Sequence, residues 1–173
     1  MLHAYICEST YDTGMRLCET LSVAPYVSSP EDVVRKMLDM VQLRKGDVLF
    51  DLGCGDGRIV LMAARDYFAK AFGVELREDL VATAREQLKR SNLEGRAQII
   101  HGDFFDVDLS KANVVTLYLT TSANEKLKSK LERELKPNSR VVSHDFSIKD
   151  WKPVEVSEKP HGHTIYLYKI GPH

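Results

Sequence analysis

The sequence predicts an α/β fold with a central, mostly parallel sheet, helices on both faces and an antiparallel hairpin at the C-terminal end. Three observations predict it. Apolar runs suited to buried strands alternate with amphipathic stretches suited to helices. A glycine-rich turn follows the first apolar run, and acidic residues stand at the ends of the first three runs, as in doubly wound sheets that bind a ligand at their carboxyl edge. Two short β-rich segments close the chain.

The composition is that of one globular domain. The chain has 173 residues and a formal net charge of −1, which gives no support for a nucleic-acid binder that acts through bulk charge. Its three cysteines show no metal-binding spacing, and an odd number argues against a disulfide framework. No apolar run approaches the roughly 18 residues of a membrane-spanning helix, and residues 1–20 are too polar for a signal peptide. We therefore expect a cytoplasmic monomer without membrane contact.

The chain divides into an N-terminal extension at residues 1–24 and a folded domain at residues 25–173. The extension has weak periodicity, and a poorly ordered terminus is expected, with a partly ordered segment that has a helical turn at residues 15–21 as the alternative. The domain opens with a loop at residues 26–30, called the leading loop below. Ser29 is the expected N-cap of the first helix and Pro30 its first-turn proline, and apolar residues continue at helical spacing to residue 41.

The alternating elements follow in order. Strands are predicted at residues 48–52, 70–75, 97–100, 114–119 and 140–146. The fourth of these is almost continuously apolar, as expected of a central strand covered on both faces. Helices are predicted directly after the glycines at residues 59–64, then at 79–90 and at 122–135. Residues 154–157 and 164–170 form the predicted hairpin, which makes one strand of the sheet antiparallel.

The glycine turn at residues 51–57 reads D-L-G-C-G-D-G and predicts the ligand. Gly53 and Gly55 permit close approach of the backbone, and the amides that follow can meet a carboxylate at the helix N-terminus. The spacing is not the G-x-G-x-x-G of dinucleotide folds. Asp51 would repel a pyrophosphate but would attract an ammonium group. S-adenosyl-L-methionine carries such a group and a positive sulfur, so we expect this cofactor, with S-adenosyl-L-homocysteine as the product.

Two further acids extend the cofactor site. Glu75 ends the second strand, where a carboxylate can accept both ribose hydroxyls. Asp103 follows the third strand and can accept from the adenine amino group, while Phe104 or Phe105 lies against the purine. A single strand-end acid is often only solvated, whereas three acids at successive strand ends favour a cofactor site.

Three neighbouring residues complete the predicted cofactor set. Leu76 and Gly102 adjoin two of these acids and are assigned to the same site. Cys54 lies within the glycine turn. Because no basic residue is adjacent in the sequence, we expect its side chain to pack there rather than to act as a nucleophile.

Several blocks along the chain carry a resemblance to a known family. They lie at residues 26–30, 33–38, 51–59, 73–75, 102–105, 119–124, 131–137, 140–144 and 163–168. Together they resemble the archaeal protein lysine methyltransferases of broad substrate range and the related mitochondrial enzymes that methylate the c-subunit of ATP synthase and the adenine nucleotide translocase. The first block commonly reads Y-V-P-T-P in that family and reads Y-V-S-S-P here.

The resemblance covers about residues 25–170. It implies a class I, Rossmann-like methyltransferase with a seven-stranded sheet. The implied reaction is transfer of a methyl group from S-adenosyl-L-methionine to lysine ε-amino groups. The implied partners are proteins with accessible lysines, without direct nucleic-acid binding.

Methyl transfer to lysine needs the neutral amine, although the pKa of lysine in solution is about 10.4. A narrow, dry channel favours the neutral form, and alignment supplies much of the acceleration. We expect Tyr118 to form the channel wall and to contact the cofactor, and Asn124 to be a polar guide. A capping role early in the helix is the alternative for Asn124. Tyr26 is expected to fold over the cofactor, with core packing as its alternative.

The remaining candidates are aromatic and histidine side chains near the C-terminal end. His144 and Asp145 could form an acid–base pair, but adjacent strand residues point to opposite faces, so we expect a structural or rim position for His144. Trp151 either walls the substrate side or covers the sheet. His161 and His163 flank a hairpin turn without ligand spacing, and we assign no metal site.

Three alternative functions stay open. Nucleic-acid amino-methyltransferases place an Asn/Asp-Pro-Pro-aromatic block after the fourth strand to hold a flipped base. Here residues 118–122 read Y-L-T-T-S, without proline. A small-molecule methyltransferase would need a lid, for which few residues remain. A non-catalytic module that only binds S-adenosyl-L-methionine would keep the same three acids.

Overall fold

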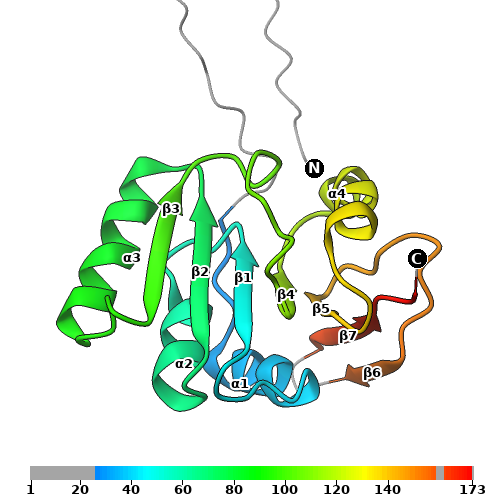
Figure 1. Ribbon diagram of the computed structural model, residues 1–173, viewed down its shortest axis with the longest axis horizontal. Coiled ribbons are helices and arrows are strands. Elements are labelled where there is room, and N and C mark those ends of the chain that lie inside the picture. The colour runs from blue at the N-terminus through cyan, green and yellow to red at the C-terminus, as the bar shows by residue number, and fades with distance from the viewer. Residues whose placement is uncertain (1–25, 159–161, 173) are drawn as a thin grey trace, which may run out of the picture.

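The computed structural model describes residues 26–158 and 162–172 of the chain. These residues form a seven-stranded sheet in the order β3-β2-β1-β4-β5-β7-β6, flanked by helices (Figure 1). The predicted extension at residues 1–24 and His161 lie outside the described residues. No helix of the described part is long and apolar enough to cross a membrane.

The strands and helices follow one another in the predicted order, with β4 directly after β3. The strands are Val48–Leu52 (β1), Lys70–Glu75 (β2), Ala97–His101 (β3), Val114–Leu117 (β4), Arg140–His144 (β5), Glu155–Glu158 (β6) and Thr164–Lys169 (β7). The helices are Glu31–Met40 (α1), Arg58–Asp66 (α2), Glu78–Arg90 (α3) and Thr121–Glu134 (α4). Strands β1 to β5 pair in parallel, and β7 runs antiparallel to both β5 and β6. The predicted single reversed strand is therefore confirmed.

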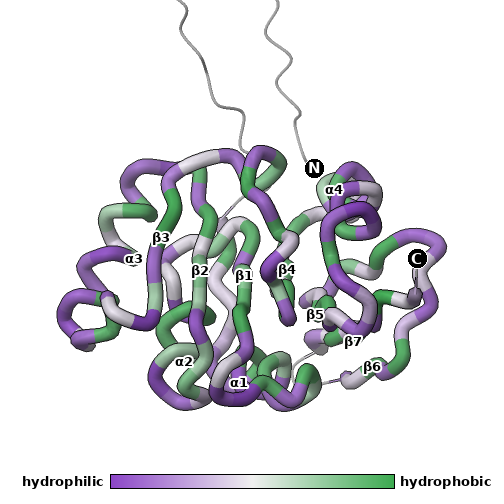
Figure 2. Tube along the Cα trace, viewed as in Figure 1, coloured by the Kyte–Doolittle hydropathy of each residue, from purple (hydrophilic) through white to green (hydrophobic). Residues whose placement is uncertain are grey.

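Two hydrophobic clusters cover the two faces of the sheet. Helices α1, α2 and α3 pack against one face around Leu49, and α4 packs against the other face around Leu117. Figure 2 shows apolar residues along the strands and polar residues on the outer turns of α3 and α4. Strand residues alternate between the faces, so Leu49 belongs to one cluster and Phe50 to the other.

The strand order creates the crevice for a ligand. From β1 the chain winds outward through β2 to β3 and then returns to β4 on the other side of β1. The loops after β1 and β4 therefore leave the sheet beside each other but in different directions, which opens a crevice at the carboxyl ends of these strands.

Several element ends differ from the prediction by one or two residues, among them the end of β5 at His144 instead of residue 146. Strand β4 ends at Leu117, and Thr120 caps α4, accepting from the Ala123 N–H at 3.3 Å. The capping alternative for Asn124 is therefore wrong. Ser29 does not cap α1, because its hydroxyl lies 2.9 Å from Nδ1 of His144, and Pro30 precedes the helix without a side-chain cap.

Candidate active site

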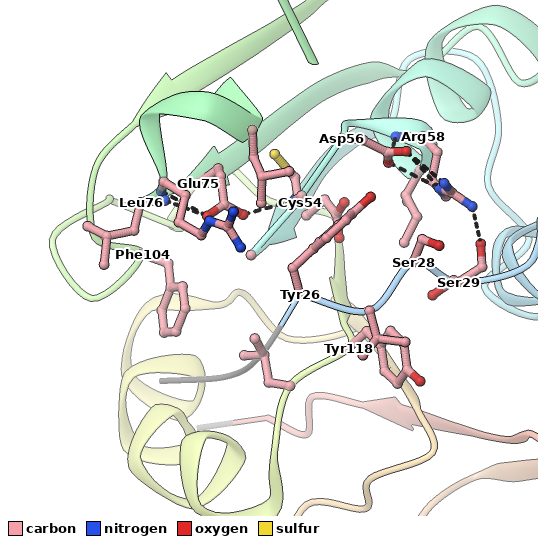
Figure 3. A pocket seen from close by; sticks show the side chains of 18 of the residues that line it. Tyr26, Ser28, Ser29, Cys54, Asp56, Arg58, Glu75, Leu76, Phe104 and Tyr118 are labelled. Atoms are coloured by element: carbon pink, nitrogen blue, oxygen red, sulfur yellow. Dashed lines mark hydrogen bonds and ion pairs between the residues drawn. The ribbon is translucent and has the colours of Figure 1, made fainter. Parts of the chain in front are cut away.

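A cleft opens at the carboxyl ends of β1, β2 and β4, beneath the leading loop (Figure 3). Apart from Gly102, every residue that the sequence assigned to the cofactor lines it. The full lining is Tyr26, Val27, Ser28, Ser29, Asp51, Gly53, Cys54, Gly55, Asp56, Arg58, Ile59, Glu75, Leu76, Arg77, Leu80, Asp103, Phe104, Tyr118 and Leu119.

Asp51 brings a buried carboxylate to the end of β1. Its Oδ1 accepts a hydrogen bond from the Thr116 hydroxyl on β4 at 2.7 Å, whereas its Oδ2 is buried without a partner. Burial raises the pKa of Asp51 to about 7, the charge of Glu75 adds to this, and the bond from Thr116 opposes it. An unsatisfied buried acceptor costs about 1–3 kcal/mol. A cationic donor from the cleft would remove that cost, so the site suits an ammonium group.

Glu75 joins the end of β2 to the glycine turn. Its Oε2 accepts from the Gly55 N–H at 2.9 Å, and its Oε1 accepts from the Leu76 and Arg77 N–H groups at 2.9 and 3.0 Å. These three bonds fix the carboxylate at the cleft. Because each carboxylate oxygen has two lone pairs and Oε1 already accepts two bonds, Oε2 keeps the capacity to accept one further hydroxyl group.

The glycine turn approaches its neighbours too closely for side chains. Gly53 and Gly55 have φ values of 77° and 54°, and a Cβ on Gly55 would collide with the ring of Tyr26. The Gly53 and Cys54 N–H groups donate to the Val74 carbonyl at 2.9 and 3.0 Å. These two bonds tie the turn to β2, and the expectation that amides after the glycines meet a carboxylate at the helix N-terminus stays a prediction.

The leading loop is fastened across the glycine turn by an ion pair. Arg58 contacts Asp56 at 2.7 Å and donates to the Ser29 carbonyl at 2.8 Å. Tyr26 lies over Gly55 with its hydroxyl directed toward Asp56 (Figure 3). Burial and the charge of Asp56 raise the pKa of Tyr26. Tyr26 thus covers the cleft rather than the core. The sequence analysis assigned no role to Asp56 and Arg58. Their opposite charges at D-G-R spacing could have indicated the ion pair.

Cys54 packs, as predicted. Its side chain is 6% exposed, and its Sγ would lie 2.6 Å from a Cβ placed on Gly73 of β2. Burial, with the charges of Asp51 and Glu75, raises the pKa of the thiol well above its usual range. A buried thiol that resists ionisation is a poor nucleophile.

The loop after β3 contributes the third acid. Asp103 and Phe104 line the cleft, and Phe104 lies near Leu76 (Figure 3). The Asp103 Oδ1 accepts from the Phe105 N–H at 2.9 Å, which folds the loop. Gly102 donates its N–H to the Glu75 carbonyl at 3.0 Å and does not line the cleft.

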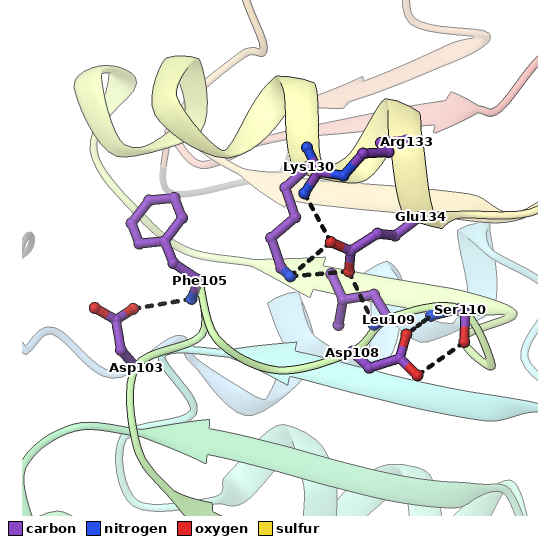
Figure 4. Close-up of polar contacts among 8 residues, drawn as sticks. All are labelled: Asp103, Phe105, Asp108, Leu109, Ser110, Lys130, Arg133 and Glu134. Atoms are coloured by element: carbon purple, nitrogen blue, oxygen red, sulfur yellow. Dashed lines mark hydrogen bonds and ion pairs between the residues drawn. The ribbon is translucent and has the colours of Figure 1, made fainter.

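Further along, α4 holds the loop after β3 (Figure 4). The Leu109 N–H donates to Oε2 of Glu134 at 3.2 Å, and Lys130 contacts the same carboxylate oxygen at 2.8 Å. Lys130 is 7% exposed, so this ion pair is largely shielded from solvent. The loop that carries Asp103 and Phe104 is thereby attached to a helix of the sheet's second face.

Tyr118 and Asn124, the two predicted catalytic residues, lie in different surroundings. Tyr118 lines the cleft, its ring stacks on His144 with centroids 3.9 Å apart, and its hydroxyl donates to Oδ2 of Asp145 at 3.4 Å. Burial and the charge of Asp145 raise the pKa of Tyr118. Asn124 is fully buried outside the cleft lining and donates to the Phe146 carbonyl at 3.0 Å. It therefore holds the segment after β5 and does not lie in the cleft as the expected polar guide.

The expected separation of His144 and Asp145 is wrong. Asp145 has a φ of 59°, which ends β5 and brings its Oδ2 to 3.4 Å from Nε2 of His144. Both atoms also lie 3.0 Å from Nδ1 of His163. Burial lowers the pKa of His144 to about 4, despite the opposing charge of Asp145. Burial alone would raise the pKa of Asp145, but hydrogen bonds from His163 and the Thr164 N–H lower it overall.

Trp151 covers the sheet and does not wall the cleft. Its ring meets Tyr168 edge-on with centroids 5.5 Å apart, and its Nε1 donates to Glu132 at 2.8 Å.

Comparison with known families identifies the family of the chain. The family model of the ANTKMT methyltransferase domain matches residues 51–155. The chain belongs to this family. The resemblance found in the sequence blocks is thereby confirmed, and so is S-adenosyl-L-methionine, the cofactor of these methyltransferases.

Related proteins match most of the length of this chain. A protein-lysine N-methyltransferase of Saccharolobus islandicus is 50% identical over 86% of this chain and 95% of its own length. The adenine nucleotide translocase lysine N-methyltransferase of Mus musculus is 36% identical over 83% of this chain. The Homo sapiens lysine N-methyltransferase of the ATP synthase C-subunit is 33% identical over 77%. The chain spans 62% and 56% of these two animal relatives.

A solved structure confirms the class I methyltransferase fold. An RNA methyltransferase from Salinibacter ruber, crystallised with S-adenosyl-L-homocysteine, superposes with a TM-score of 0.83. It is 41% identical and the match covers 85% of this chain and 95% of that one.

Proposed function

We propose that this protein transfers the methyl group of S-adenosyl-L-methionine to lysine ε-amino groups of other proteins. The cleft supports the cofactor half of the proposal through one observation, the buried and unpartnered Oδ2 of Asp51. The substrate half is supported by 50% identity to a protein-lysine N-methyltransferase over 95% of that protein's length.

The residues of the cleft suit successive parts of the cofactor. Oδ2 of Asp51 would accept from the ammonium group, and the free lone pair on Oε2 of Glu75 would accept from a ribose hydroxyl. Leu76 and Phe104 offer apolar surface for adenine, and Asp103 offers an acceptor for its amino group. The methionine carboxylate would meet the hydroxyls that line the cleft below the leading loop.

Tyr118 is the residue that we assign to the reacting centre. When bound, S-adenosyl-L-methionine supplies an electrophilic methyl group on a positively charged sulfur. The aromatic face of Tyr118 can stabilise the positive charge that develops on the substrate nitrogen. Stacking on His144 and the bond to Asp145 hold this ring in place, so it can align the amine for in-line attack.

The substrate lysine arrives as an ammonium ion and must lose a proton before it reacts. An amine that enters the cleft loses part of its hydration, which disfavours its charged form. The proton passes to solvent. Phe146, which is 37% exposed and 6.4 Å from Tyr118 between ring centroids, extends the apolar surface toward the outside. Such a surface would shield the aliphatic stem of the lysine from water.

RNA methylation is the second candidate, because the Salinibacter ruber protein is described as an RNA methyltransferase. The net charge of −1 and the absence of proline at residues 118–122 favour the protein substrate. We also propose that the chain works as a monomer without direct nucleic-acid contact. The expected cytoplasmic location stays a prediction.

Methyl-labelled cofactor separates these functions. Purified protein is incubated with labelled S-adenosyl-L-methionine and with protein, RNA and DNA fractions of cells. We expect label in protein, on lysine, with loss of at least 90% of it in Asp51→Asn. The control is Asp79→Asn, which changes an exposed acid. This variant should methylate as much protein as the unchanged enzyme does. Label confined to RNA would overturn the proposed substrate, and binding without transfer to any fraction would leave only a cofactor-binding module.

A further inference from the structure

Three potential metal ligands meet where β5 ends and β7 begins. They are His144, Asp145 and His163. Nδ1 of His163 lies 3.0 Å from both Nε2 of His144 and Oδ2 of Asp145, and the last two atoms are 3.4 Å apart. Within residues 26–158 and 162–172, this is the one group of three such side chains close enough to share an ion.

Other contacts orient two of these side chains from behind. The second ring nitrogen of His144 lies 2.9 Å from the Ser29 hydroxyl. The second oxygen of Asp145 accepts from the Thr164 N–H at 2.9 Å. Contacts of this kind set the tautomer of a ligating imidazole and the direction of a ligating carboxylate.

Hydrogen bonds alone cannot satisfy all three contacts. Each of the three atoms faces the other two, and a ring nitrogen carries at most one proton. With the proton on His163, the lone pair of His144 faces the Asp145 carboxylate. With the proton on His144, the lone pair of His163 faces that carboxylate instead. With protons on both, two N–H groups oppose each other at 3.0 Å. Tyr118 donates only to Asp145 and changes none of this.

We propose that His144, Asp145 and His163 bind one divalent transition-metal ion of the Zn²⁺ type. Tetrahedral Zn²⁺ holds imidazole nitrogens at about 2.0–2.1 Å, which places ligand atoms about 3.3 Å apart. The observed separations of 3.0 to 3.4 Å need only small side-chain shifts to reach it. Two imidazoles exclude Ca²⁺ and Mg²⁺ as preferred occupants, because these ions select oxygen ligands.

The surroundings leave a path and an open position for the ion. The side chain of His144 is buried, whereas those of His163 and Asp145 are 28% and 25% exposed. Three protein ligands leave the fourth position of a tetrahedral ion to solvent. The bound ion would tie β5 to β7 and stiffen the support of Tyr118, and no step of methyl transfer passes through it.

Metal binding tests this site independently of methyl transfer. Tag-free protein is freed of metal with a chelator and titrated with Co²⁺, whose tetrahedral complexes absorb in the visible range, and with Zn²⁺ in competition. We expect one saturable site per chain, with Zn²⁺ displacing Co²⁺ and raising the melting temperature by several degrees.

Two variants of the partly exposed ligands locate the site. His163→Gln and Asp145→Asn should each weaken Co²⁺ binding at least tenfold. His101→Gln, which changes an exposed histidine bonded to the Leu76 carbonyl, should bind as the unchanged protein does. Cooperative melting of each variant checks that it folds. The proposal is overturned if the unchanged protein shows no saturable binding at millimolar Co²⁺, or if both ligand variants bind as tightly as it does.

Discussion

Asp51 lowers the stability of the free protein and favours binding of the cofactor. Its carboxylate is buried near Glu75 and Asp56, and Thr116 supplies its one hydrogen bond. The raised pKa of about 7 means that the folded free protein holds a proton on Asp51 that the unfolded chain loses near pH 4. The free energy of unfolding therefore falls as the pH rises from about 4 to 7. A bound ammonium group offsets that loss.

The affinity for the cofactor should therefore depend on pH. Because an ammonium group prefers the ionised carboxylate, we expect the affinity for S-adenosyl-L-homocysteine to rise about tenfold per pH unit between pH 5.5 and 6.5 and to level off above pH 7. Calorimetric titrations across this range measure it. Asp51→Asn should bind weakly and lose this slope. An unchanged slope in that variant would assign the titration to another group.

Replacing Glu75 should weaken cofactor binding more than replacing the nearby exposed acid Asp79. Glu75→Ala removes the acceptor for the ribose and leaves the Gly55 N–H without its partner, so we expect the affinity for S-adenosyl-L-homocysteine to fall about 100-fold. Asp79→Ala, an exposed acid paired with Arg77, is the matched control and should bind normally. Calorimetry decides the point, since wild-type affinity in Glu75→Ala would contradict the ribose assignment.

At the scale of elements, the joint between the glycine turn and β2 sets the shape of the cleft. Both Gly53 and Cys54 donate to the Val74 carbonyl, and Cys54 occupies the space beside Gly73. The turn can lie this close to β2 only because residue 73 has no side chain.

Gly73→Ala should therefore destabilise the protein. Its Cβ would lie 2.6 Å from Sγ of Cys54 and 2.9 Å from Cδ1 of Ile99, and overpacking of this kind costs about 1–3 kcal/mol. We expect a melting temperature lower by roughly 2–10 °C. Adding Cys54→Ala should restore part of the loss. Gly102→Ala meets no atom within 4 Å and should melt as the unchanged protein does. Equal melting of both glycine variants would refute close packing at this joint.

The element boundaries also show what local patterns can predict. The limits of β1 and β2 follow from apolar runs bounded by turn residues, and both are as predicted. The end of β5 does not follow, because the positive φ of Asp145 depends on its bonds to His163 and Thr164 in β7 and the loop before it. Ser29 likewise has the sequence of a helix cap but contacts His144, which is 115 positions away.

At the scale of the whole molecule, the reversal of strand order between β1 and β4 determines where the cleft lies. The order of apolar and amphipathic stretches predicted this architecture, and the residues predicted around the strand-end acids line the cleft, apart from Gly102. Side-chain partnerships between distant elements could not be predicted, because no periodic pattern encodes them. Examples are the link from Arg58 to the Ser29 carbonyl and the cluster around His163.

A crystal structure of the protein with S-adenosyl-L-homocysteine would show directly how Asp51, Glu75 and Tyr118 meet the cofactor. We expect the ammonium nitrogen within hydrogen-bond distance of Oδ2 of Asp51, a ribose hydroxyl on Oε2 of Glu75, and the sulfur facing Tyr118. A cofactor bound elsewhere, or an Asp51 Oδ2 that stays without a partner in the complex, would contradict this account.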